Sequence, residues 1–341
     1  MRYSIIVPVY NRPDEVDELL QSLSEQTVKD FEVLIVEDGS IKPCKDVCDK
    51  YANILDLHYY AKENSGPGQS RNYGAERANG EYVIILDSDV VLPTDYLQAV
   101  EDELKQNPCE AFGGPDATHS SFTPIQKAIS YSMTSFFTTG GIRGGKGKAK
   151  LDKFYPRSFN MGIRRDVYLQ LGGFSKMRFG EDIDFSYRIV EAGYMPRLFP
   201  EAWVWHKRRT DFRKFFRQVY NSGIARINLE KRHPGTMKLV HLLPTVFTLG
   251  VIGLLLISLF WPLACVPIIL YSLIIGIDSS IQNKSLWVGV LSIPAAFVQL
   301  MGYGFGFIES WWKRCILKQD EFSPCERSEI ERSAFEKNFY K

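Results

Sequence analysis

Short apolar runs alternate with segments of helical periodicity along the first third of the chain. The apolar runs, rich in β-branched residues, occupy positions 4–9, 31–36, 57–60 and 81–86, and the helical segments occupy 14–26 and 70–78. This alternation predicts βαβ units and a mostly parallel, Rossmann-like α/β sheet with helices on both faces. Ligands bind such sheets at the carboxyl ends of the strands, so we expect the functional residues just after each apolar run.

The pattern changes after about residue 240, where three charge-free stretches follow at 242–260, 262–277 and 286–308. Crossing a bilayer takes about 20 apolar residues, so the first and third stretches qualify and the second is short. Tryptophans flank them as interfacial anchors would, at Trp261, Trp287, Trp311 and Trp312. We expect a C-terminal transmembrane helical region at 240–310 and a tail at 311–341; a large buried helical core is the alternative.

A basic amphipathic segment, residues 211–232, precedes these stretches. Phe212, Phe215 and Val219 share one helical face, and Arg213 and Lys214 lie off it. Such a helix next to membrane spans predicts an element in the headgroup plane. An ordinary surface helix packed on the preceding domain, which we place at 1–230, is the alternative.

Charge and cysteine content narrow the function classes. The net charge is +1, from 41 basic and 40 acidic residues, so no global field favours nucleic acid as a partner. The six cysteines are scattered, and we expect reduced thiols. Because the chain opens directly into an apolar strand, a signal peptide is not expected, and the first domain is predicted to face the cytoplasm.

Asp87-Ser88-Asp89 follows the apolar run that ends at Leu86. Carboxylates two residues apart on an extended chain point the same way and can hold a divalent cation, either Mg²⁺ or Mn²⁺. A simple acidic turn at a strand end is the alternative.

Three further polar segments are candidates for binding and catalysis. Glu37-Asp38-Gly39 could accept hydrogen bonds from a nucleoside, Arg71 could meet a diphosphate, and Asp182 could take a proton from an acceptor hydroxyl. Each has a structural alternative: a turn, a surface loop and a helix N-cap respectively. Residues 140–146 nearly fit a phosphate-binding loop, but Gly147 stands where Ser or Thr is needed, so ATP binding is not expected.

The order of these motifs resembles glycosyltransferase family 2, whose fold is GT-A. The resemblance covers about residues 2–230 and rests on seven segments: 4–11, 36–40, 64–72, 86–89, 159–162, 172–174 and 180–182. Seven ordered motifs are far more specific than any one of them.

The resemblance implies roles for individual residues. It places the nucleoside among Pro8, Tyr10, Glu37 and Asp38, with the rest of the donor near Arg71, Asp87 and Ser88. It implies that Asp89, Asp87 and His206 lie at the divalent metal, with Asp89 the most direct ligand, although a lone histidine is often structural. It makes Asp182 the catalytic base and places Asn160 and Glu181 on the acceptor side.

We therefore expect an inverting, metal-dependent glycosyltransferase that uses a nucleotide diphosphate sugar and a glycan or lipid-linked acceptor at the inner membrane. Residues 217–221 lack the Arg-Trp of processive synthases, which favours single additions. A nucleotidyltransferase and an inactive membrane scaffold are the alternatives.

Membrane topology follows from the basic residues on the two flanks of the apolar region. They include Lys231 and Lys238 before it and Lys313 and Lys318 after it, and both flanks should stay on the cytoplasmic side. That requires an even number of crossings, in conflict with three apolar stretches. Either residues 242–277 make one full crossing plus a re-entrant piece, or the positive-inside bias fails at the tail. A tight two-helix hairpin at Trp261-Pro262, which would put the tail outside, is the alternative.

Overall fold

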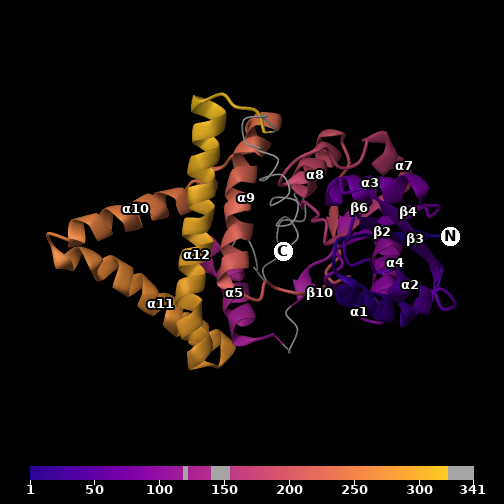
Figure 1. Ribbon diagram of the computed structural model, residues 1–341, viewed down its shortest axis with the longest axis horizontal. Helices are drawn as coiled ribbons and strands as arrows, with labels where there is room; N and C mark the ends of the chain where they lie inside the picture. The colour runs from indigo at the N-terminus through magenta and orange to yellow at the C-terminus, as the bar shows by residue number, and fades with distance from the viewer. Residues whose placement is uncertain (118–121, 140–153, 322–341) are drawn as a thin grey trace.

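A computed structural model describes residues 1–117, 122–139 and 154–321. An α/β part lies at one end of the molecule and a group of long helices at the other (Figure 1). The near-match to a phosphate-binding loop at 140–146 and most of the tail beyond residue 321 fall outside the described residues.

A seven-stranded sheet forms the centre of the α/β part, in the order β3-β2-β1-β4-β8-β6-β9. The strands are β1 (Tyr3–Val9), β2 (Phe31–Asp38), β3 (Asp56–Lys62), β4 (Tyr82–Leu86), β6 (Ala111–Gly113), β8 (Asn160–Arg164) and β9 (Arg197–Leu198). The four strands expected from the apolar runs pair in parallel, whereas β8 runs antiparallel to both β4 and β6. The mostly parallel α/β sheet is therefore confirmed.

A second, three-stranded sheet lies beside the carboxyl end of β4. It consists of β5 (Val90–Val91), β10 (Val204–His206) and β7 (Asp116–Ala117), in that order. β10 runs antiparallel to β5 and pairs His206 with Val90. This pairing brings a residue from far along the chain next to the Asp87–Asp89 segment.

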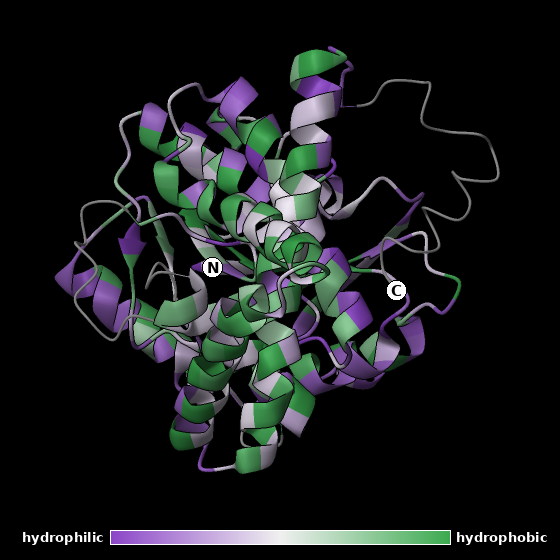
Figure 2. Cartoon of the chain, turned by 90° about the vertical axis from the view of Figure 1, so that its left-hand side faces the viewer, coloured by the Kyte–Doolittle hydropathy of each residue, from purple (hydrophilic) through white to green (hydrophobic). Residues whose placement is uncertain are grey.

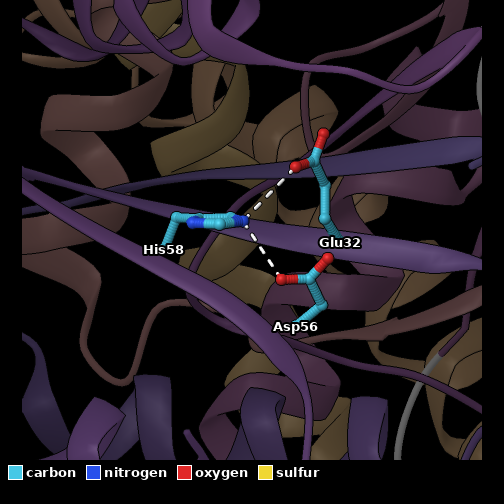
Figure 3. Close-up of side chains that lie close together, drawn as sticks. All are labelled: Glu32, Asp56 and His58. Atoms are coloured by element: carbon cyan, nitrogen blue, oxygen red, sulfur yellow. Dashed lines mark ion pairs between the residues drawn. The ribbon is translucent and has the colours of Figure 1, made fainter.

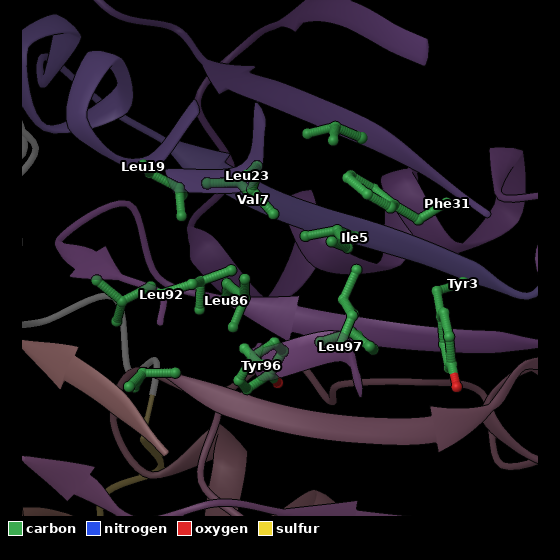
Figure 4. Packing of buried hydrophobic residues seen from close by; sticks show 14 of the residues in the cluster. Tyr3, Ile5, Val7, Leu19, Leu23, Phe31, Leu86, Leu92, Tyr96 and Leu97 are labelled. Carbon is green, nitrogen blue, oxygen red and sulfur yellow. The ribbon is translucent and has the colours of Figure 1, made fainter. Parts of the chain in front are cut away.

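Helices cover both faces of the large sheet because β1 alternates its side chains between two cores. They are α1 (Pro13–Ser24), α2 (Lys45–Tyr51), α3 (Pro67–Arg77), α4 (Tyr96–Gln106), α7 (Arg165–Gln170) and α8 (Glu181–Glu191). Ile5 and Val7 pack with Leu19 of α1 and Leu97 of α4 (Figure 4). Ile6 points to the other face, where α3, α7 and α8 supply the partners. Alternation along a half-buried strand produces this division.

The long helices at the other end are α10 (Leu243–Ser258), α11 (Val266–Asn283) and α12 (Leu286–Trp311). With their flanking turns, residues 239–258, 262–283 and 286–316 are each long and apolar enough to cross a membrane. They fit a transmembrane region, and hydrophobic residues dominate the helices that face the viewer in Figure 2. The expectation that the second stretch is too short is wrong. Its helix continues past the charge of Asp278, whose carboxylate accepts a hydrogen bond from Tyr131 at 2.6 Å.

Three helices connect the two ends of the molecule. They are α5 (Pro124–Thr134), α6 (Phe136–Thr139) and α9 (Phe212–Arg232). The segment predicted to be an amphipathic helix at 211–232 is α9, and Asp211 caps it by accepting a hydrogen bond from the Lys214 N–H. Its buried residues include Phe215 and Val219, which pack against Ile129 of α5.

Candidate active site

The carboxyl ends of β1, β2 and β4 meet at one edge of the large sheet. Tyr10 follows β1, Asp38 ends β2 and Asp87 follows β4. This is the edge at which parallel sheets bind ligands, so the positions expected from the apolar runs do converge.

Asp89 and His206 form the centre of the site. The Oδ1 atom of Asp89 lies 3.2 Å from Nε2 of His206, and the Lys207 N–H donates to the Asp89 carbonyl at 3.1 Å. The His206 ring stacks on Phe159 at 4.9 Å between centroids. The β5–β10 pairing therefore fixes His206 against the aspartate, a contact that no sequence spacing reveals.

Asp87, Asp89 and His206 can together hold a divalent cation. One ligand atom from each lies within 4.8 Å of the others. Asp89 is 7% exposed, and within the described chain its Oδ1 atom accepts no hydrogen bond despite the nearby imidazole. A buried carboxylate oxygen with no aligned donor is stabilised by a cation, which can be the imidazolium of His206 or a metal ion. The residues present therefore fit a metal ion, with carboxylate and imidazole ligands of the kind that Mn²⁺ accepts.

Positive groups surround this pair and set its charge state. Arg12 Nη1 lies 3.2 Å from Asp89 Oδ2, and Arg209 Nη1 lies 3.9 Å from the same atom. Burial opposes ionisation of Asp89, but His206, Arg209 and Arg12 outweigh it and lower the pKa of Asp89. Burial likewise opposes a charge on His206, yet Asp89 raises the pKa of His206 overall.

Arg71 connects the metal-binding segment to Glu181, the residue before the expected base. It is 3% exposed, and its Nη2 donates to Asp87 at 2.8 Å while its Nη1 donates to Glu181 at 3.2 Å. Its guanidinium lies 5.1 Å from the centre of the Phe174 ring. Burial raises the pKa of Glu181, against the opposing effect of Arg71. A cation held between two acidic residues in this way positions both of them.

Asp182 lies next to Glu181 in the first turn of α8, after Gly180. Gly180 adopts a φ of +87°, a left-handed conformation that suits glycine. The Oδ2 atom of Asp182 lies 3.0 Å from Nε of Arg157, and Oδ1 accepts from the Ile183 N–H at 2.9 Å. Asp182 therefore does more than bond to the backbone of its own helix. Its Oδ2 atom also pairs with Arg157, whose side chain is partly exposed.

Glu37 and Asp38 bind the protein's own donors. Glu37 accepts from the Cys44 N–H at 2.7 Å and the Tyr59 hydroxyl at 3.3 Å. Asp38 accepts from the N–H groups of Ser65 and Gly66, each at 2.9 Å. Both are buried. They hold the loops at the ends of β2 and β3, and a direct contact with a nucleoside stays a prediction for both.

Asn160 also lies inside the protein rather than at an open surface. It accepts from the Tyr96 hydroxyl at 2.6 Å and donates to the Ala202 carbonyl at 2.8 Å. Its expected place on the acceptor side stays a prediction. Tyr10 and Ser88 are buried at the strand ends, and Pro8 is partly buried within β1.

Two arginines of the site were not identified from the sequence. Arg12 follows β1 directly, so its position after a strand end was the available signal. Arg157 lies two residues before the 159–162 motif but outside it, and only its contact with Asp182 reveals it.

A second group of metal-ligand type lies at the amino ends of β2 and β3, away from this edge (Figure 3). Nε2 of His58 lies 3.2 Å from Asp56 and 3.5 Å from Glu32. Glu32 already accepts from Ser4 at 2.6 Å and from the Asn79 N–H at 2.6 Å. Its bonding needs are met within the fold, and the group serves as a comparison for the Asp89 site.

Comparisons with known proteins agree on the class. Residues 4–172 match glycosyl transferase family 2. An uncharacterised glycosyltransferase of Haemophilus influenzae is 29% identical over 203 residues, which cover 55% of this chain and 62% of the relative. A poly(ribitol-phosphate) β-N-acetylglucosaminyltransferase of Staphylococcus aureus is 40% identical over 93 residues, covering 26% and 16%. The chain thus spans less than two thirds of either relative.

Among solved structures, a mannosyltransferase from Pyrobaculum calidifontis, in complex with GDP-Man and Mn²⁺, shares the fold. Its TM-score is 0.63 at 17% identity, over 92% of this chain and 88% of that one. The similarity extends beyond the α/β part, and the GT-A fold expected from the motifs is confirmed.

Proposed function

We propose that this chain, which belongs to glycosyl transferase family 2, moves a sugar from a nucleotide diphosphate sugar to an acceptor hydroxyl with inversion at the anomeric carbon. The proposal rests on one connected group of side chains. Arg71 pairs with Asp87 of the Asp87–Asp89 segment and with Glu181, which precedes Asp182 in the chain. This group offers a site for a diphosphate-bound cation and a separate carboxylate.

Different residues of the site would bind the metal, stabilise charge and accept the proton. Asp89, Asp87 and His206 would hold a divalent ion, which stabilises negative charge on a departing diphosphate when bound. Arg12 and Arg209 add positive charge around the same carboxylate. Asp182 accepts the proton of the acceptor hydroxyl as its oxygen attacks the anomeric carbon. One displacement from the opposite face inverts the configuration and needs no carboxylate nucleophile.

The donor class is supported by fold relatives that bind nucleotide sugars: the mannosyltransferase with GDP-Man and the S. aureus enzyme solved with UDP-GlcNAc. We further propose a lipid-linked or glycan acceptor at the inner membrane, with the catalytic part in the cytoplasm. Its support is the three helices that fit a transmembrane region directly after the α/β part.

The test is a donor screen with the purified full chain that follows nucleoside diphosphate release and the anomeric configuration of the product. We expect release that depends on Mg²⁺ or Mn²⁺ and is lost in EDTA and in Asp89→Asn. Asp56→Asn is the matched control, because that carboxylate belongs to the second acidic group and is half exposed, and it should retain full activity.

Three outcomes would contradict the proposal. Full activity of Asp89→Asn or in EDTA would remove the metal role. Release of pyrophosphate would indicate a nucleotidyltransferase. If the chain turned over no donor even in the presence of membrane lipid, the inactive membrane scaffold would be the remaining hypothesis.

A further inference from the structure

The helix α12 differs from α10 and α11 in how much protein surrounds it. In the most apolar part of α12, about 39% of the residues are buried. The corresponding share is 11% for α10 and 17% for α11. Its first half packs on α5, where Val288 and Ala295 contact Ala128. Its second half packs on α9. A helix with protein along its whole length is not constrained to stand across a bilayer.

α9 and α12 run side by side and in the same direction (Figure 1). Glycines allow their backbones to touch: a Cβ atom on Gly302 would lie 2.5 Å from Val219, and one on Gly306 would lie 2.0 Å from the Tyr220 carbonyl oxygen. Further along, the Ser310 hydroxyl donates to the Ile224 carbonyl at 3.2 Å. The order of these contacts ascends in both helices, so the orientation of α9 fixes that of α12.

α9 is attached to the catalytic part as well. Gly180, two residues before the expected base, packs against Ala225 and Leu229. Arg226 donates to the Tyr187 hydroxyl of α8 at 3.2 Å. With 21 residues α9 is about 32 Å long, comparable with the ~30 Å hydrocarbon layer. If α9 stood across the bilayer, the catalytic part would enter the bilayer with it.

The charges of α9 lead to the same conclusion. They extend from its first turn to its last, at Arg213, Lys214, Arg217, Arg226, Glu230, Lys231 and Arg232. The uncharged stretch between Arg217 and Arg226 is only about 13 Å long, so a spanning α9 would place ionised side chains inside the ~30 Å hydrocarbon layer. That is unfavourable, whereas the same residues along the headgroup plane are not. The charges therefore favour a position of α9, and of its neighbour α12, along the membrane surface rather than across it.

α10 and α11 have the opposite character. Residues 242–277 contain no Asp, Glu, Lys or Arg. The two helices project away from the catalytic part and meet at a tip (Figure 1). At this tip Leu259 is 76% exposed, Phe260 91% and Trp261 59%. Apolar side chains exposed to this degree need a nonpolar partner.

Both legs of this hairpin return to the same helical layer. The Thr248 side chain packs against Gly304 of α12, and Ser279 of α11 bonds to Ser292 at 2.6 Å. Beyond α12, Glu321 accepts from the Arg178 N–H at 2.8 Å and lies 3.4 Å from Arg232. The chain that leaves α12 is therefore back against the catalytic part.

We infer that α5, α9 and α12 form a platform in the headgroup plane of a lipid bilayer, and that the α10–α11 hairpin alone enters the hydrocarbon core. The exposed stripe of α12 rests at the membrane surface, with Trp287 and Val290 near one end and Phe305 and Trp312 near the other. With only the hairpin in the hydrocarbon core, the chain before α10 and the chain after α12 lie on the same side of the membrane. This agrees with the basic residues on both flanks, although the chain has three apolar stretches.

Fluorophore depth in vesicles tests this arrangement. Single cysteines replace Val290 and Phe305 on α12, both exposed, in a chain whose Cys265, Cys315 and Cys325 are changed to Ser. A bimane label on each is quenched by lipids that carry spin labels at two known depths. These positions are about 22 Å apart along a helix, so a spanning helix separates their depths by roughly 20 Å.

We expect the two α12 labels to report the same shallow depth, within about 5–10 Å of the headgroup boundary. Val246 and Leu256 on α10, also exposed, are the matched pair, and Leu256 should report the greater depth. A depth difference near 20 Å across α12 would overturn the platform. Equal depths on α10, or labels that no lipid quenches, would overturn the inserted hairpin.

Discussion

Asp182 has a carboxylate oxygen 3.0 Å from Arg157, at the start of α8. Asp182→Asn keeps the shape of the side chain but removes its ability to take a proton. We expect turnover to fall by about 10²–10⁴-fold, since that is the usual effect of losing a general base. Donor binding should change little, because the donor contacts proposed for Arg71 and Asp89 remain. Titration calorimetry with donor and a turnover assay separate the two effects.

Asp166→Asn is the matched control for this variant. Asp166 also lies in the first turn of a helix and pairs with an arginine, Arg164, at 2.6 Å. It should keep normal turnover. If Asp182→Asn behaves like Asp166→Asn, Asp182 only stabilises its helix.

His206 should decide which divalent ion works best. An imidazole ligand suits Mn²⁺ better than Mg²⁺, whereas carboxylates accept both. We expect higher activity with Mn²⁺ than with Mg²⁺ at equal concentration, and we expect His206→Asn to reduce this ratio several-fold. Rates of nucleoside diphosphate release across titrations of both ions provide the measurement. An unchanged ratio would mean that His206 is not a ligand and serves only to orient Asp89.

Among the elements, the α9–α12 contact depends on glycines. Gly306→Ala would place a methyl group 2.0 Å from the Tyr220 carbonyl oxygen, so the helices must separate. We expect a loss of about 1–3 kcal/mol, the usual cost of overpacking. Gly253→Ala in α10 is the control, because among the described residues no atom outside its own helix backbone lies within 4 Å of its Cβ position. The midpoint temperature of thermal unfolding in detergent should fall for Gly306→Ala and stay constant for Gly253→Ala.

The contact between α8 and α9 depends on Asp184. It lies 3.0 Å from His233 Nε2 and 3.1 Å from Arg188 Nε, and it is nearly fully buried. Burial opposes its ionisation, but Ser175, His233 and Arg188 outweigh burial and lower its pKa. Its stabilising contribution is therefore complete above the unfolded-state pKa of about 3.9 and is lost as the pH falls through the folded-state value.

Asp184→Asn should cost about 3 kcal/mol at pH 7, because it leaves buried partners uncompensated. It should also flatten the dependence of stability on pH below about 4. Asp166→Asn, which breaks a pair at the surface, should cost less than about 1 kcal/mol. Unfolding midpoints between pH 3 and 7 measure both effects. Equal losses for the two variants would show that Asp184 contributes no more than a surface pair.

Sequence periodicity located the elements that carry their own pattern. The apolar runs predicted β1 to β4, and the charge pattern predicted α9. The direction of β8 was not predictable, because an antiparallel pairing with β4 depends on partners far along the chain. The same limit applies to the site: the Asp87–Asp89 spacing is local, but the contacts of Arg12 with Asp89 and Arg157 with Asp182 exist only in the folded chain.

Hydropathy identifies the three long helices, which fit a transmembrane region, but it does not determine their directions. α12 meets the length and composition needed for a membrane span, yet its neighbours rather than its sequence determine its direction. In the whole molecule, α9 contacts the segment before Asp182 on one side and α12 on the other. An acceptor held in the membrane would therefore lie close to the proposed base, which accords with transfer at the bilayer surface.

A native cysteine can report on which side of the membrane the chain after α12 lies. Cys315 is exposed and lies just beyond α12. In a chain with Cys265 and Cys325 changed to Ser, we expect an impermeant thiol reagent to label Cys315 in inverted membrane vesicles but not in intact cells. Lys45→Cys, combined with Cys315→Ser, is the control on the catalytic part, where Lys45 is exposed.

The two positions should give the same result, because Glu321 holds the chain after α12 against Arg178 of the catalytic part and Arg232 at the end of α9. Labelling of Cys315 in intact cells, with position 45 protected, would mean that α12 crosses the bilayer. That pattern would restore three crossings and overturn the even count. Labelling of both positions in intact cells would retain the even count but reverse the orientation proposed for the catalytic part.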